Sequence, residues 1–226
     1  HPVDRRQRQM CIRDSIGGVI LFDETIRQSS DDGTLLRDII SNQGALPGIK
    51  VDKGLQPIDG CPGETVTVGL EGLNERLNEY SSMGAKFTKW RAVINIGDGI
   101  PTDKCIDANM EALADYAKCA QDNGMVPIVE PEVLMDGDHS IDECYAASVR
   151  SLKSLFEHLN NKDVNIKGTL LKPNMVTSGK GSSNQAGIDE VAKKTLDCLI
   201  SNVPTELPGI TSVSYTHLTL PTINWV

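Results

Sequence analysis

Hydrophobic and polar residues follow two patterns that take turns along the chain. Short apolar runs rich in bulky and β-branched residues predict strands, and longer segments with apolar residues three or four positions apart predict amphipathic helices. This alternation is typical of an α/β protein with a parallel sheet. Strands are expected over residues 17–24, 48–52, 87–91, 126–132, 166–172 and 209–211, and helices over 34–41, 70–83, 102–123, 140–159 and 188–199.

Several residues at the starts of the predicted helices fit capping roles. Thr34 and Thr102 stand where a side-chain oxygen can accept a hydrogen bond from the first turn, and Ser140 with Glu143 matches a capping box. Residues 54–69, rich in Gly, Pro and Asp, are expected to form a loop longer than the usual connection. The loop either borders a functional site or is a plain surface excursion, and the sequence favours neither.

Four of the predicted strands end in a charged residue. Lys50, Lys89, Glu130 and Lys172 follow one another at intervals of about 40 residues, the length of one strand-plus-helix unit. Crossover helices keep the strands parallel, so their C-terminal ends meet at one mouth, which is the active site in a (β/α)8 barrel. The sequence therefore predicts a TIM barrel. Because only five clear strands and a short sixth are found, the barrel is expected to be incomplete, with the first and last strands missing.

Lys172 is the most informative of these charges. It ends an apolar run and is followed at once by Pro173, which offers no N–H to continue a ladder and holds the preceding residue extended. A lysine ending a buried strand can serve as an amine nucleophile. The structural alternative is a buried lysine that pairs with Glu130.

The other strand ends add charge of both signs. Alternation puts Lys89 with Arg91 on one face of their strand, as it does Glu130 with Glu132. The cations could bind an anionic substrate. They could equally form ion pairs at the mouth, Lys50 with Asp52 and Arg91 with Glu132, and both readings stay open.

Composition excludes several function classes. The 226-residue chain has a net charge of −9, which argues against nucleic acid or an anionic membrane surface as the main partner. The six cysteines contain no C-x-x-C pair, so we expect reduced thiols rather than disulfides or a zinc site. Four distant histidines make no metal signature, and no apolar run reaches membrane-spanning length. No metal and no cofactor are expected.

The two ends of the chain do not fit this pattern. Residues 1–15 and 212–226 have no helix or strand period that continues the barrel, and both resemble translated sequencing adapters. A disordered basic tail and a terminal strand are the alternatives. We therefore expect a partial barrel over residues 16–211 between two non-native tails.

The motifs at the strand ends resemble those of class I fructose-bisphosphate aldolases. The resemblance runs from about residue 16 to 211 and rests on several long motifs in the right order: GGVILF at 17–22, GIKVDKG at 48–54, KWR at 89–91, VPIVEPE at 126–132 and GTLLKPNMV at 168–176. It implies a cytoplasmic, metal-free barrel that is a homotetramer in its full-length form. The implied reaction is the reversible retro-aldol cleavage of fructose 1,6-bisphosphate to dihydroxyacetone phosphate and glyceraldehyde 3-phosphate in glycolysis.

The resemblance also implies roles for individual residues. Lys172 matches the Schiff-base lysine, Glu130 the proton-transfer carboxylate, and Lys89 the basic neighbour that polarises the substrate. Glu132 matches a member of the site's hydrogen-bond network. In addition, Lys50 and Arg91 match positions that bind the sugar phosphate substrate.

Some family motifs have no counterpart in this sequence. The first barrel strand with its catalytic aspartate, the Ser- and Gly-rich phosphate loop and the last strand are not found. We therefore expect that this chain could lack turnover. Two alternatives remain: another imine-forming aldolase that acts on a different sugar phosphate, or an inactive aldolase fragment that serves as a binding or scaffold protein.

Overall fold

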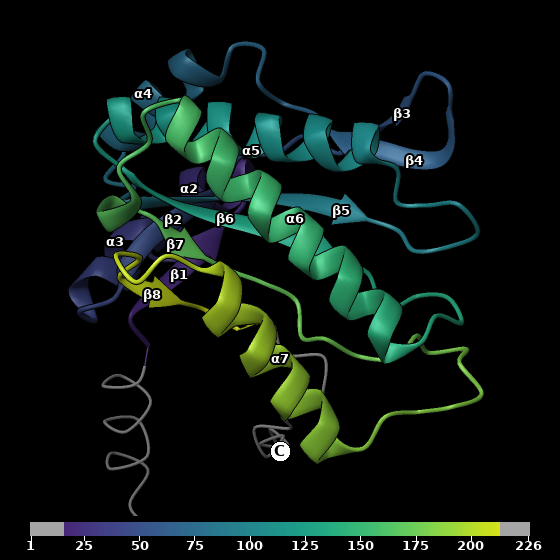
Figure 1. Ribbon diagram of the computed structural model, residues 1–226. Coiled ribbons are helices and arrows are strands. Elements are labelled where there is room, and N and C mark those ends of the chain that lie inside the picture. The colour runs from purple at the N-terminus through teal and green to yellow at the C-terminus, as the bar shows by residue number, and fades with distance from the viewer. Residues whose placement is uncertain (1–15, 213–226) are drawn as a thin grey trace, which may run out of the picture.

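Six parallel strands form the sheet at the centre of the molecule. The computed structural model describes residues 16–212 (Figure 1). The strands pair in chain order, β1-β2-β5-β6-β7-β8, and all five pairings are parallel. Their bounds are Gly18–Leu21 for β1, Leu46–Lys50 for β2, Phe87–Ile94 for β5, Val126–Val133 for β6, Leu170–Leu171 for β7 and Gly209–Ile210 for β8.

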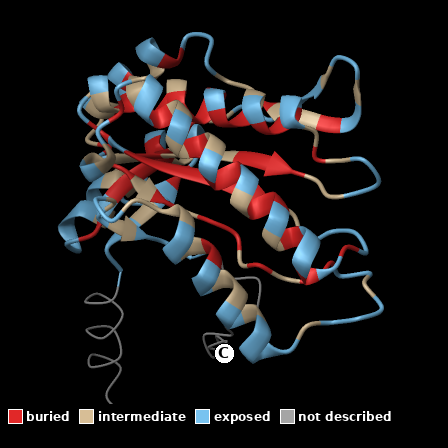
Figure 2. Ribbon diagram, in the orientation of Figure 1, coloured by how far each residue is buried: buried red, intermediate tan, exposed pale blue. Residues whose placement is uncertain are grey.

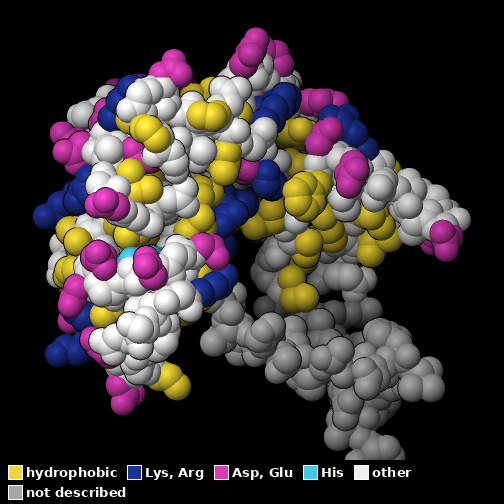
Figure 3. Space-filling view, turned by 90° about the vertical axis from the view of Figure 1, so that its right-hand side faces the viewer, with side chains coloured by type: hydrophobic (Ala, Val, Ile, Leu, Met, Phe, Trp, Pro, Cys, Tyr) yellow, Lys and Arg dark blue, Asp and Glu magenta, His cyan; other side chains and the backbone are white. Residues whose placement is uncertain are grey.

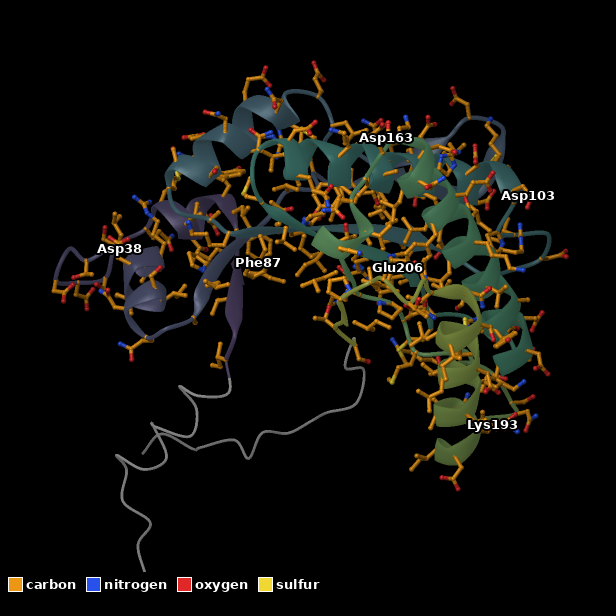
Figure 4. All side chains as sticks on the ribbon, turned by 60° about the vertical axis from the view of Figure 1, so that its left-hand side comes forward. Asp38, Phe87, Asp103, Asp163, Lys193 and Glu206 are labelled. Atoms are coloured by element: carbon orange, nitrogen blue, oxygen red, sulfur yellow. The ribbon has the colours of Figure 1, made fainter. Side chains whose placement is uncertain are left out.

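Helices cover one side of this sheet. They are α2 (Asp23–Arg27), α3 (Leu36–Asn42), α4 (Leu73–Ser82), α5 (Asp103–Asp122), α6 (Ile141–Asn161) and α7 (Ile188–Asn202). Figure 4 shows the described chain as an arch with the helices along its outer side. Strands that pair in sequence order with helices outside are the repeating unit of a barrel wall. The fold is therefore an incomplete (β/α)8 barrel, as the sequence predicted.

The hydrophobic core lies between the sheet and the helices (Figure 2). On β5, Thr88, Trp90 and Ala92 are fully buried on the helix-facing side. The Trp90 ring stacks on Tyr116 of α5, with 5.4 Å between centroids. The apolar stripe expected on that helix is buried along its whole length: Ile106, Met110, Leu113 and Ala117. Core packing thus leaves the alternate residues of β5 to face the inside of the arch.

Two of the predicted helix starts are confirmed. The Thr102 hydroxyl accepts a hydrogen bond from the Cys105 N–H at 3.2 Å at the start of α5. At the start of α6, Ser140 and Glu143 form both hydrogen bonds of a capping box. These caps fix where each long helix begins after its strand.

The prediction that residues 54–69 form an irregular loop is wrong. It contains an antiparallel hairpin, β3 (Leu55–Ile58) and β4 (Cys61–Thr67), with a bulge near Pro57. The turn between the strands is Asp59-Gly60, and Gly60 has a φ of 78°. Asp-Gly is a strong hairpin signal because glycine adopts positive φ without strain.

Near the N-terminus the predicted bounds are also corrected. The first strand ends at Leu21, and Asp23 and Glu24, expected within it, form the acidic first turn of α2, where carboxylates favour the helix dipole. Thr34 does not cap α3, whose N-cap is Leu35. Instead the Thr34 N–H donates to the Asp32 carboxylate at 2.9 Å. Thr34 is therefore part of the turn that precedes α3.

The segment around Lys172 is shorter as a strand than expected. Residues Ile166–Gly168 form a 3-10 turn that is capped by the Asn165 side chain, so Gly168 does not share a strand face with Lys172. The backbone N–H of Lys172 nevertheless donates to the Val129 carbonyl at 2.8 Å. Lys172 is thus held beside β6, one residue beyond the end of β7. Of the tails expected at residues 1–15 and 212–226, all but residue 212 lie outside the described residues.

Candidate active site

The charged residues singled out in the sequence come together at the C-terminal ends of the strands. β2 pairs with β5 so that Lys50 lies beside Lys89, and β5 pairs with β6 so that Arg91 lies beside Glu130. Figure 3 looks at the end of the molecule toward which β5 points, and it shows Lys and Arg side chains gathered at a hollow. The expectation that the strand ends form one mouth is met.

Glu130 is the centre of this cluster. Its residue exposure is 3 %, and each carboxylate oxygen contacts a different ammonium group. Lys89 Nζ lies 2.9 Å from Oε2, and Lys172 Nζ donates a hydrogen bond to Oε1. The pairing of Lys172 with Glu130, which the sequence left as a structural alternative, is therefore present. A carboxylate held between two amines is also in hydrogen-bond reach for proton transfer with either of them.

The outer charges of the mouth form two further pairs. Arg91 donates through Nε to the Glu132 carboxylate. Lys50 pairs with the Asp52 carboxylate and also donates to the Asp52 carbonyl at 3.1 Å. Both ion pairs that the sequence offered as alternatives to substrate binding are thus formed. Their cations remain partly accessible, with side-chain exposures of 41 % for Arg91 and 28 % for Lys50.

Burial differs systematically across the cluster. The three carboxylate side chains are 7 % exposed or less, whereas the exposed fractions of the lysine and arginine side chains run from 12 % for Lys89 to 41 % for Arg91. Four cations face three carboxylates here, so the mouth carries positive charge at its accessible surface. Such a surface suits an anionic ligand, because arginine and lysine bind phosphate by charge-assisted hydrogen bonds.

Buried amide and hydroxyl groups join the hairpin to α5 and β5, and the sequence reasoning missed them. Thr67 of the hairpin donates through its hydroxyl to the Arg91 carbonyl at 2.8 Å. Asn109 of α5, fully buried, accepts from the Thr67 N–H and donates to the Thr65 carbonyl. The hairpin signal at Asp59-Gly60 could have placed Thr67 on a strand, but no sequence pattern marks Asn109.

Comparison with known proteins agrees with this geometry. The family model of class I fructose-bisphosphate aldolase, which is described as glycolytic, matches residues 7–218. The probable class 1 fructose-bisphosphate aldolase of Xanthomonas campestris is 55 % identical over 203 residues, which are 90 % of this chain and 61 % of that protein. The chain belongs to the class I fructose-bisphosphate aldolase family.

Other class I aldolases match over the same stretch. Cytosolic fructose-bisphosphate aldolase 4 of Arabidopsis thaliana is 45 % identical over 88 % of this chain and 51 % of its own length. The aldolase of Plasmodium falciparum, solved with TRAP and a small-molecule inhibitor, superposes with a TM-score of 0.87 at 42 % identity. That match covers 89 % of this chain and 58 % of the Plasmodium chain. The chain thus spans about half to three-fifths of the length of these relatives.

Within residues 16–212, no three His, Cys, Asp or Glu side chains gather closely enough to hold a metal ion. None of the helices in that range combines the length and apolar character needed to cross a bilayer.

Proposed function

We propose that the protein is a class I fructose-bisphosphate aldolase in which Lys172 forms a Schiff base with the sugar phosphate. The observation that carries the proposal is buried Glu130, held between Lys172 and Lys89 at the mouth of an aldolase-family barrel. The overall reaction cleaves fructose 1,6-bisphosphate reversibly to dihydroxyacetone phosphate and glyceraldehyde 3-phosphate.

The first stage is imine formation at Lys172. Its amine adds to the substrate ketone carbon, which gives a carbinolamine. Loss of water from that intermediate gives a protonated imine. An ordinary lysine amine is neutral in only about one molecule in 2,500 at pH 7, so the amine must give up a proton before it can attack. Glu130, whose Oε1 contacts Lys172 Nζ, is placed to accept that proton and to return it to the departing hydroxyl.

The second stage is cleavage of the C3–C4 bond. The C4 hydroxyl gives up its proton to Glu130 as the bond breaks. The electron pair of that bond moves into the protonated imine, which becomes an enamine, and glyceraldehyde 3-phosphate leaves as the aldehyde. Protonation of the enamine at C3 and hydrolysis of the imine then release dihydroxyacetone phosphate and restore the free lysine. These steps need a group that accepts the C4 hydroxyl proton and later donates a proton to C3. Glu130, a carboxylate again once water has left, serves this role in the proposal.

The remaining site residues bind and orient the substrate. Lys89 holds the second oxygen of Glu130 and supplies positive charge that polarises the substrate. Glu132 orients Arg91 through their ion pair. Arg91 and Lys50 are the partly exposed cations at the rim and bind the phosphate groups, exchanging their present carboxylate partners for phosphate oxygens.

The family resemblance also leads us to propose a cellular location and an oligomeric state. We place the protein in the cytoplasm, in line with the Arabidopsis relative that is named cytosolic. A homotetramer is the proposed assembly, and light scattering of the purified protein measures it directly. A mass close to a single chain would contradict that assembly without touching the imine chemistry.

Borohydride trapping tests the imine. The folded protein is mixed with dihydroxyacetone phosphate, reduced, digested and examined by mass spectrometry. We expect one reduced adduct, on Lys172. The Lys172→Met variant should lose it, while Lys167→Met, which changes an exposed lysine in the neighbouring turn, should keep it. Absence of the adduct from the folded protein, or an adduct on another lysine, would overturn the proposal.

A further inference from the structure

The backbone pairing between β6 and β7 ends at Lys172. β6 and β7 pair only at Leu170 and Leu171, and the Lys172 N–H adds one more bond to Val129. Pro173 follows and has no N–H to donate. The regular ladder therefore offers nothing beyond Lys172 to fix its strand end against β6.

Beyond Lys172, the side chain of Asn174 makes the hydrogen bonds that connect this segment to β6 and α6. Its Oδ1 accepts a hydrogen bond from the Val133 N–H of β6 at 3.2 Å. Its Nδ2 donates to the Ser148 hydroxyl of α6 at 3.0 Å and to the Met175 carbonyl at 3.1 Å. Asn174 is 5 % exposed, so water has little access to compete for these bonds. One buried amide thus joins the end of β7 to β6 and to α6.

We infer that Asn174 is a positioning residue that holds Lys172 against Glu130. Asn174 lies two residues after Lys172, and its partner Val133 lies directly after Glu132 on the strand that carries Glu130. The amide therefore fixes the relative height of the two strand ends from which the reacting amine and the carboxylate project. The inference rests on the proposed function, because it assigns Asn174 to the imine chemistry of Lys172.

The expected effect follows from geometry. A misplacement of about 1 Å in a reacting group can lower the rate by roughly 100-fold. Asparagine is the side chain that fits here, because the site needs one acceptor for Val133 and two donors for Ser148 and Met175. Alanine at this position would leave the Val133 N–H without its partner and free the strand end to shift.

A matched control separates positioning from general stability. Asn109 is also a buried amide that accepts one backbone N–H, from Thr67, and donates twice, to the Thr65 and Cys105 carbonyls. It joins α5 to the hairpin rather than to the strand end of Lys172. Asn109→Ala should therefore lower the stability about as much as Asn174→Ala while leaving the lysine in place.

The experiment measures the rate of imine formation on Lys172 by rapid borohydride quenching at saturating dihydroxyacetone phosphate, with folding checked by circular dichroism. We expect at least a tenfold slower rate in Asn174→Ala and less than a twofold change in Asn109→Ala. Ser148→Ala, which removes a single partner of the amide, should slow the reaction about threefold. It serves as the test if Asn174→Ala does not fold.

The outcomes distinguish this inference from the proposed function. No adduct in the unmodified protein overturns the proposed function and the inference with it. A normal adduct in the unmodified protein, with equal rates in the folded Asn174→Ala and Asn109→Ala variants, overturns the inference alone. An unfolded Asn174→Ala together with an unchanged rate in Ser148→Ala overturns it as well.

Discussion

Glu130 illustrates how one residue can serve both the fold and the proposed chemistry. Its carboxylate is buried and contacts the ammonium groups of Lys89 on β5 and of Lys172, which directly follows β7. A buried carboxylate that lost both partners would carry an uncompensated charge, which is strongly destabilising. The same contacts put Glu130 within proton-transfer distance of Lys172. The structural and the catalytic readings of these residues thus describe a single set of contacts.

One carboxylate, Glu130, is shared by two lysines, and this unequal number of partners leads to a stability prediction. Glu130→Gln removes the shared counter-charge of Lys89 and Lys172, whereas Lys89→Met leaves Glu130 paired with Lys172. Breaking a buried ion pair costs about 3–5 kcal/mol, so we expect Glu130→Gln to reduce the free energy of unfolding by about that amount. Lys89→Met should cost clearly less. Urea denaturation of both variants checks this order, and an equal loss would show that Lys172 does not compensate.

At this scale the sequence predicted that the charged residues come together, but not every contact that holds them. Their convergence could be predicted because charges that end apolar strands about one βα unit apart meet at the barrel mouth. Asn174 escaped notice because a single buried amide leaves no periodic signal. Its partners, Val133 and Ser148, lie 41 and 26 residues away along the chain, and only the folded chain brings them together.

At the scale of elements, the predicted helices and strands were correct where several local sequence signals agreed. Long amphipathic helices with a capping residue, such as α5 and α6, were placed correctly because periodicity and caps agree there. The hairpin of β3 and β4 differs from the loop predicted over residues 54–69 because a segment rich in Gly and Pro can still pair when it contains a hairpin turn. Asp59-Gly60 is such a turn. β7 proved shorter than predicted because Asn165 caps a competing 3-10 turn.

The capping box of α6 gives a prediction about pH. Hydrogen bonds from the Ser140 backbone N–H, and then from its hydroxyl, lower the pKa of Glu143. A carboxylate with a lowered pKa in the folded state stabilises that state above its unfolded pKa, about 4.3, and loses this contribution as the pH falls through the folded value. Glu143→Ala should therefore be less stable than the original protein at pH 7, and the difference should disappear in stronger acid.

Urea denaturation at pH 7, 5 and 3 measures this difference. Glu157→Ala is the control, because it removes an exposed carboxylate near the other end of the same helix. A stability difference for Glu143→Ala that persists unchanged at pH 3 would mean that its carboxylate charge contributes nothing to the cap.

At the scale of the whole molecule, parallel order is what the sequence predicted most completely. Alternating strands and helices leave few topologies open, since crossover connections between parallel strands are right-handed and neighbours in sequence tend to pair. The observed order β1-β2-β5-β6-β7-β8 is the one expected for a barrel wall. The packing of helices over the sheet, by contrast, depends on side chains from distant segments, such as Trp90 against Tyr116.

Buried thiols report on the opening of the whole molecule. Burial, as the main cause, raises the pKa of Cys105 to about 12 and that of Cys198 to about 11. The thiolate is the reactive form, so both should resist iodoacetamide at pH 8 while half-buried Cys61 reacts. In urea all three should react alike. Peptide mass spectrometry measures the rates, and equal labelling of Cys61 and Cys105 in the native protein would contradict the described core.

The separation of the cluster along the chain also sets an order of events during synthesis. Lys172 follows Glu130 by 42 residues, which at about 5–20 residues per second takes the ribosome roughly 2–8 seconds. During that interval the nascent chain already contains Glu130 and Lys89 but not Lys172, the second partner of Glu130. The ion-pair cluster can therefore be completed only after the segment that carries Lys172 has been made.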